Sequence, residues 1–231
     1  MKTIGLLGGM SWESTEHYYR ALNEGVKAKL GKFHSAKIIM ESFDFQEVLD
    51  LVESRGWDAT ADLLVMNARK LEASGAELLL LCSNTPHKVA PQIERAVQIP
   101  FLHIADATGR RVRERGFTTV GLLGTLTTME DDFYTSRLGS KHGLRVLVPM
   151  KDDRDLVHRI IFDELVMGIV RDDSRQELLR IMQGLFDQGA QGVIEGCTEL
   201  VMSVRQEHID IPLFDTTTIH VQAALEMAFN S

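Results

Sequence analysis

The sequence predicts an α/β fold made of two pseudo-symmetric three-layer halves, each with a mostly parallel sheet between layers of helices. Two observations support this prediction. Apolar runs of strand length alternate with helix-length segments along the 231-residue chain, and the whole pattern occurs twice. The runs are apolar throughout, which is typical of parallel strands covered on both faces.

The expected elements follow in order along the chain. Apolar runs of strand length occur at 3–7, 36–40, 77–82, 99–102, 118–123, 144–148, 192–195 and 211–214. Segments with a period of about 3.6 residues separate these runs, as at Ala61–Ala73 and Arg175–Phe186. Parallel strands need long connections that are usually helical, so each such segment is expected to cover a face of a sheet.

The internal repeat can be read directly from the residues. The stretch TIGLLGGMSWESTEHYY from Thr3 aligns with TVGLLGTLTTMEDDFY from Thr119, and GAELLLLCSNT aligns with GAQGVIEGCTE. We therefore expect one half over residues 1–104, completed by a C-terminal helix over 215–231, and a second half over 105–214. Equivalent strand ends are expected to meet at one cleft, because ligands of open α/β sheets bind outside the carboxyl ends of the strands.

The chain has two cysteines, and each ends an equivalent strand: Cys82 in the first half and Cys197 in the second. Two thiols at one cleft suit stereoinversion, in which one removes a proton from carbon and the other delivers a proton to the opposite face. A nucleophilic cysteine would need a histidine partner, for which His87 and His103 are near in sequence, but it would leave the second thiol without a role. Buried, inert thiols are the remaining alternative.

The residues after each cysteine predict how reactive the thiols are. Thr85 suits an N-cap and Pro86 the first helical position, so a short helix to about Ile93 is expected after Cys82. The apolar segment after Cys197 is also expected to be helical. A helix N-terminus beside each thiol is expected to lower the thiol pKa.

Polar residues at the same strand ends are the candidates for holding a substrate. The loops GLLGGMSWES and GLLGTLTTME lack the glycine spacing of nucleotide-binding turns, so we expect tight connections capped by Ser11 or Thr127. Uncharged donors beside a thiol can bind a carboxylate and stabilise a carbanion without neutralising the base. The predicted substrate-binding residues here are Met10, Ser11, Ser83, Asn84, Thr85, Thr125, Thr127 and Thr198.

Composition limits the partners and the compartment. The net charge of −8 disfavours nucleic acid, and the basic residues of Arg110–Arg115 are expected to form one helix face. No apolar stretch approaches the length that spans a bilayer, and the first residues enter a strand without a secretory signal pattern. We therefore expect a cytoplasmic protein that acts on a small molecule.

Cofactors are not expected. The eight histidines show no metal-binding spacing, and no lysine stands in a setting typical of pyridoxal phosphate. Two cysteines are too few for a disulfide framework or a four-thiolate zinc site. The acidic stretch DDRD at 152–155 is expected to be a solvated helix start.

The motifs GLLGGMS, CSNTPHK, FLHIADAT, GVIEGCTEL and FDTTTIH together resemble the aspartate/glutamate racemase superfamily, and within it the aspartate racemase family. The resemblance implies a cofactor-independent amino-acid racemase of two pseudo-symmetric domains, with homodimers as a possible assembly. It implies that Cys82 and Cys197 are the paired acid/base residues, with Cys197 acting on the L-enantiomer. By the same resemblance Asn84, Thr85 and Thr198 bind the carboxylate and ammonium ends of the substrate, and Met10 is a glycine-loop contact.

The resemblance to strict aspartate racemases is incomplete. Those enzymes are expected to place cationic side chains around the pocket, where they hold the second carboxylate of the substrate. The corresponding stretches, Gln46–Glu53 and Ile160–Met167, contain no Lys or Arg. The resemblance is therefore closer to broad-specificity amino-acid racemases, with Val52 and Glu164 as expected pocket residues. Hydantoin racemisation, maleate isomerisation and decarboxylation are alternative reactions in the superfamily, and a non-catalytic small-molecule binding domain is a further alternative.

Overall fold

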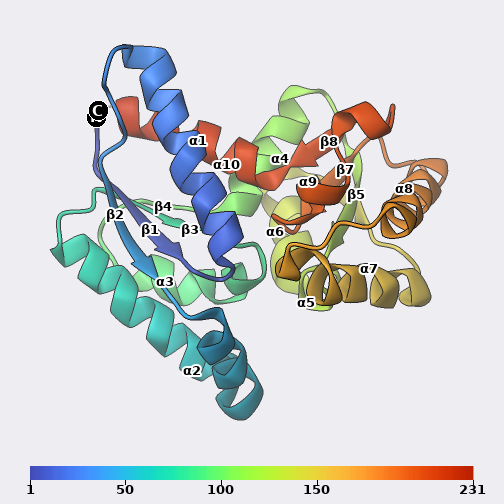
Figure 1. Ribbon diagram of the computed structural model, residues 1–231, viewed down its shortest axis with the longest axis horizontal. Coiled ribbons are helices and arrows are strands. Elements are labelled where there is room, and N and C mark those ends of the chain that lie inside the picture. Colours follow the sequence, from blue (N-terminus) through green and yellow to red (C-terminus); the bar gives the residue numbers. More distant parts are fainter. Residues whose placement is uncertain (231) are drawn as a thin grey trace. The chain divides into compact units, whose positions relative to one another are not determined.

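The computed structural model describes residues 1–230, and these residues fold into two α/β units (Figure 1). The first unit contains Met1–Ile104 and the C-terminal segment that starts at His220, and the second unit contains Ala105–Ile219. The chain therefore passes between the units twice, after Ile104 and before His220.

The first unit is built on a parallel sheet with the strand order β2-β1-β3-β4. Its strands are β1 (Ile4–Gly8), β2 (Ile38–Ser42), β3 (Leu78–Leu81) and β4 (Phe101–Leu102). The side chains of Leu78–Leu81 are all fully buried, because β3 is central in the sheet and covered on both faces.

Helices cover both faces of this sheet. They are α1 (Trp12–Leu30), α2 (Phe45–Ala73), the 3-10 helix η1 (Thr85–Val89), α3 (Ala90–Ala96) and α10 (Thr216–Phe229). Figure 1 shows α1 and α10 on one face and α2 and α3 on the other. Helix α2 bends at Gly56, whose φ of +75° is readily adopted only by glycine, and its second part includes the predicted helix Ala61–Ala73.

The second unit repeats the same topology in a parallel sheet with the order β6-β5-β7-β8. Its strands are β5 (Thr119–Gly124), β6 (Arg145–Leu147), β7 (Val193–Gly196) and β8 (Leu213–Asp215). The equal strand order means that β3 and β7 are equivalent strands, so the fold class and the internal repeat predicted from the sequence are confirmed.

The helices of the second unit form its core together with the sheet. They are α4 (Ile104–Glu114), α5 (Leu126–Glu130), α6 (Asp132–His142), α7 (Lys151–Asp163), η2 (Leu165–Met167), α8 (Asp172–Asp187), α9 (Leu200–Ser203) and η3 (Gln206–His208). Buried side chains of α7 and α8 pack against β5 and β7. The predicted helix Arg175–Phe186 lies within α8, and the DDRD stretch lies in the first turns of α7, as expected.

The helix expected from Thr85 to Ile93 differs from the prediction. Thr85 is already inside η1, Asn84 takes the cap position without capping the helix through its side chain, and α3 starts separately at Ala90. Pro91 explains the break, because it has no N–H to donate to the carbonyl of His87 and so interrupts the α-helical ladder. The N-cap prediction for Thr85 was wrong for this reason.

Candidate active site: a cysteine at the same strand exit of each unit

Cys82 directly follows β3, and its main chain is held from two sides. Its N–H donates to the carbonyl of Leu7 at 2.9 Å, and the hydroxyl of Ser14 donates to the Cys82 carbonyl at 2.9 Å. Leu7 belongs to β1 and Ser14 to α1, so the neighbouring strand and helix both fix the strand exit. The side chain is 1% exposed, and this burial raises the pKa of the Cys82 thiol.

Cys197 follows β7 in the second unit and has an acidic partner. Its Sγ donates to Oε2 of Glu199 at 2.9 Å, and the hydroxyl of Thr198 donates to the same oxygen at 2.7 Å. Burial raises the pKa of the Cys197 thiol well above its usual value, and the nearby Glu199 charge raises it further. Cys197 is 8% exposed.

The expectation that helix dipoles lower both thiol pKa values is therefore wrong. The helical turns that follow are short: η1 after Cys82 is a 3-10 helix, and α9 spans only Leu200–Ser203. A short helix contributes little dipole, whereas burial removes water from the thiolate and favours the protonated form. Both cysteines are thus expected to carry their protons in the absence of a substrate.

Glu199 is a candidate site residue that the motifs of the sequence did not single out. The signal was present in the internal repeat, because the position two residues after the cysteine is Asn84 in the first half and Glu199 in the second. Asn84 is 3% exposed and Glu199 is 5% exposed, so both side chains are buried. The two equivalent cysteines therefore differ in local charge.

In the first unit, the predicted substrate-binding residues gather at one edge of the sheet. Met10 and Ser11 follow β1, and Cys82 follows the adjacent β3, so parallel pairing places all three at the carboxyl edge of the sheet. Ser11 is the N-cap of α1, as predicted, and its hydroxyl accepts the N–H of Ser14 at 3.4 Å. Ser83, Asn84 and Thr85 continue the chain from Cys82 at the same edge; Asn84 is buried, and Ser83 and Thr85 are partly exposed.

In the second unit, Thr125, Thr127 and Thr198 lie at the corresponding edge. Thr125 is the N-cap of α5 and accepts the N–H of Thr128 at 3.3 Å, while Thr127 lies inside the helix. The prediction that Thr127 caps this helix was wrong, because the helix begins right after Thr125, at Leu126. The hydroxyl of Thr198 donates its hydrogen bond to Glu199.

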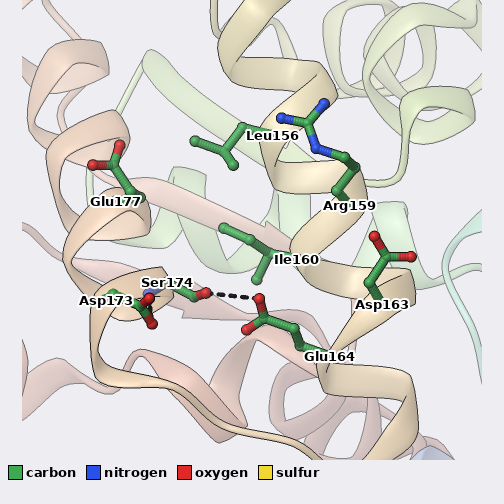
Figure 2. A pocket seen from close by; sticks show the side chains of 8 residues that line it. All are labelled: Leu156, Arg159, Ile160, Asp163, Glu164, Asp173, Ser174 and Glu177. Atoms are coloured by element: carbon green, nitrogen blue, oxygen red, sulfur yellow. Dashed lines mark hydrogen bonds between the residues drawn. The ribbon is translucent and has the colours of Figure 1, made fainter.

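Val52 and Glu164, the expected side-chain pocket residues, lie in different units. Val52 is half-buried on α2. Glu164 ends α7 and lines a hollow of about 320 Å³ between α7 and α8, where Oε1 accepts the hydroxyl of Ser174 at 2.9 Å (Figure 2). The hollow is lined by Leu156, Arg159, Ile160, Asp163, Glu164, Asp173, Ser174 and Glu177. Cys197 is not one of these lining residues.

His87 is not placed to act as the histidine partner of a nucleophilic Cys82. Its Nδ1 lies 2.7 Å from the carbonyl of Ser83, and its Nε2 accepts the N–H of Ile104 at 3.2 Å. Both ring nitrogens therefore bond to the main chain. The ring of His103 packs against that of His87 in a tilted arrangement, with ring centroids 4.4 Å apart.

Across residues 1–230, no cluster of three or more His, Cys, Asp or Glu side chains could hold a metal ion. In the same part of the chain, every helix is too short or too polar to cross a membrane.

Comparison with known proteins assigns this arrangement to a class. A Yersinia pestis protein provisionally named an Asp/Glu racemase is 48% identical, with all of both chains covered and a TM-score of 0.94. An aspartate racemase homologue from Pyrococcus horikoshii is 36% identical over 99% of both chains, with a TM-score of 0.86. These similarities place the chain in the racemase class of isomerases.

The family follows from the sequence itself. The model of the Asp/Glu/Hydantoin racemase family matches residues 7–224, and this chain belongs to that family. The broad-specificity amino-acid racemase RacX of Bacillus subtilis is 25% identical over 163 residues, which cover 69% of this chain and 68% of RacX.

Proposed function

We propose that the protein racemises free α-amino acids without a cofactor, with Cys82 and Cys197 as the two acid/base groups. One observation carries this proposal: the chain's two cysteines follow β3 and β7, the equivalent strands of two units with the same topology. Coincidental placement of inert thiols would not select the same strand exit in both units. The family membership and the names of the similar proteins support the same reaction.

The reaction needs one thiolate and one thiol on opposite sides of the α-carbon. The thiolate takes the α-proton and becomes a thiol, the electron pair stays on carbon, and the opposite thiol gives its proton to the other face. After one turnover the protonation states of the two sulfurs are exchanged. The enzyme is then ready for the opposite enantiomer. Each of the two protonation forms therefore acts on one enantiomer.

Glu199 makes these two forms unequal. Its charge disfavours the Cys197 thiolate, so of these two forms the one that offers Cys197 as the proton donor is the more populated. The L-enantiomer, which the resemblance assigns to Cys197 as base, would be deprotonated by the less populated form. Because the equilibrium constant of a racemisation is one, the two directions must still have equal kcat/KM. We therefore expect kcat and KM each to differ between the two enantiomers while their ratio stays the same.

Uncharged groups are proposed to hold the substrate. Asn84, Thr85 and Thr198 bind its carboxylate and ammonium ends, and Met10 contributes a main-chain contact. Hydrogen-bond donors at the carboxylate stabilise the carbanion as charge moves onto the oxygens, and they do so without neutralising the thiolate. Further hydroxyl groups at the same strand exits belong to Ser11, Ser83, Thr125 and Thr127.

The proposed substrate range is broader than aspartate and glutamate. Gln46–Glu53 and Ile160–Met167 provide no cation for a side-chain carboxylate, and Glu164 would repel one. The printed name of the Bacillus subtilis relative supports a broad range. We expect neutral or basic side chains to be preferred, with Val52 and Glu164 contacting them.

A chiral assay of the purified protein tests this function. Each common amino acid is offered as a single enantiomer, with no added cofactor and with a chelator present, and both enantiomers are quantified over time. We expect both to approach equal amounts for several substrates. Loss of carbon dioxide, isomerisation of maleate or turnover restricted to hydantoins would replace the proposal with another reaction of the superfamily. Binding without any turnover would support a non-catalytic role.

A further inference from the structure

The imidazoles of His87, His103 and His220, here called the histidine cluster, are buried together in the first unit. Their side chains are at most 2% exposed. The ring centroid of His87 lies 4.4 Å from that of His103 and 6.1 Å from that of His220. His87 connects the loop after Cys82 with the first boundary of the unit, because it bonds to Ser83 and to Ile104. His220 lies at the second boundary, where the chain returns to the first unit.

The hydrogen bonds of His87 fix its tautomer. The N–H of Ile104 can only donate, so Nε2 of His87 must be the unprotonated acceptor. The carbonyl of Ser83 can only accept, so Nδ1 carries the proton and donates to it over 2.7 Å. His87 is therefore neutral, and a proton added at Nε2 would point two donors at each other.

His220 forms a second bridge with the opposite tautomer. The carbonyl of Leu102 lies 2.9 Å from Nε2, which must carry the proton, and the hydroxyl of Tyr18 lies 2.8 Å from Nδ1, which accepts. Burial lowers the pKa of His220 to about 4, which agrees with a neutral ring. This bridge joins α1 and α10 to the end of β4.

We propose that His87 is a positioning residue for Cys82, an inference that rests on the function proposed above. Ser83 directly follows Cys82, and its carbonyl is held by a ring whose other nitrogen is anchored at Ile104, the last residue before the chain leaves the first unit. Because His87 holds the Ser83 carbonyl, it fixes the direction of the main chain after β3. The direction of the main chain in turn sets the direction of the Cys82 thiol. The His87 bridge therefore ties the position of the Cys82 thiol to the first crossing between units.

Two substitutions separate the two halves of the bridge. In His87→Asn the side-chain amide reaches the place of Nδ1 and can still donate to Ser83. In His87→Gln the longer side chain reaches the place of Nε2 and can accept from Ile104, but the bond to Ser83 is lost. The measurement is the rate at which iodoacetamide alkylates Cys82, determined by peptide mass spectrometry and divided by the rate at Cys197 in the same molecule.

We expect His87→Gln to raise this ratio about tenfold, the effect of one lost hydrogen bond on local opening, and to lower kcat more than it raises KM. His87→Asn is expected to keep the ratio and kcat within about twofold of the unmodified protein, since it keeps that bond. Equal effects of the two substitutions, or no effect of either, would overturn the proposal. If His87→Gln does not fold, His87→Phe, which removes both bonds, is expected to raise the ratio at least as much, and an unchanged ratio would overturn the proposal.

Tyr18→Phe is the matched control, because it removes the donor to His220 and leaves the His87 bridge intact. It is expected to lower the thermal stability without changing the alkylation ratio. A ratio raised as much as by His87→Gln would mean general loosening of the unit and would contradict a positioning role. The ratio needs no turnover, so an inactive unmodified protein would refute the proposed function and still leave the role of His87 to be decided by alkylation.

Discussion

At the scale of single residues, the two thiols are equivalent in the fold and different in their electrostatics. Cys197 donates to the Glu199 carboxylate, while the same position beside Cys82 is the neutral Asn84. A buried carboxylate near a thiol disfavours the thiolate, because two negative charges repel each other where water cannot screen them. The symmetry of the fold therefore does not extend to the proton affinity of the sulfurs.

This difference predicts the effect of Glu199→Gln. The glutamine keeps an acceptor for the thiol but removes the charge that raises the Cys197 pKa, so that pKa should fall. The pH at which Cys197 alkylation is half-maximal should then shift downward by about one unit. Peptide mass spectrometry across a pH series measures the shift.

Asn84→Asp is the reciprocal variant, and it should move the alkylation profile of Cys82 upward while Cys197 keeps its own. A Cys197 profile that does not move in Glu199→Gln would show that the carboxylate does not control the thiol.

The positions of the candidate residues in the fold were easier to predict from the sequence than their protonation. The cysteines and their neighbours could be found because the repeat aligns them and because the strand exits collect ligand-binding residues. The raised thiol pKa could not be predicted, since it depends on burial by elements distant in sequence. The engagement of both His87 nitrogens likewise depends on Ile104 and on the path of the loop, which no local pattern encodes.

At the scale of elements, strands were predicted well and helix starts less well. Each expected strand is present within a few residues, because buried parallel strands are continuous apolar runs. The separate start of α3 depends on a single proline, and the start of α5 depends on the residue at which β5 ends. Such boundaries are decided by hydrogen bonds of a few main-chain groups, which weak local preferences do not determine.

The turn between β1 and α1 predicts a contrast between two glycines. Gly9 has a φ of +86°, and a Cβ there would lie 2.2 Å from the carbonyl oxygen of Phe43, so Gly9→Ala should cost about 2–4 kcal/mol of unfolding free energy. Gly184 lies in the last turn of α8, and a Cβ there would meet no atom within 4 Å. Gly184→Ala should therefore stabilise the protein by about 0.5–1 kcal/mol through helix propensity.

Denaturant unfolding followed by circular dichroism measures both changes. A neutral Gly9→Ala would mean that the turn can rearrange away from Phe43. A destabilising Gly184→Ala would mean that the outer face of α8 is covered in solution.

At the scale of the whole molecule, two units of one topology each contribute one thiol at the same strand exit. A repeated fold supplies two similar acid/base groups, which is what inversion at a carbon requires of an enzyme without a cofactor. The double variant Cys82→Ser/Cys197→Ser should keep the fold and bind amino acids with little change, because the proposed carboxylate contacts remain. Calorimetric titration measures this binding, and loss of binding would place the thiols in substrate recognition as well as in catalysis.

The two-thiol mechanism is tested most directly by α-hydrogen exchange in D₂O. Exchange is measured for Cys82→Ser and Cys197→Ser, with each enantiomer offered separately. We expect either substitution to lower racemisation about 10²- to 10⁴-fold. We also expect each variant to retain exchange, without inversion, for one enantiomer only. The enantiomer that still exchanges should differ between the two variants. Unimpaired racemisation by either variant, or exchange of the same enantiomer by both, would contradict a pair of thiols acting on opposite faces of one carbon.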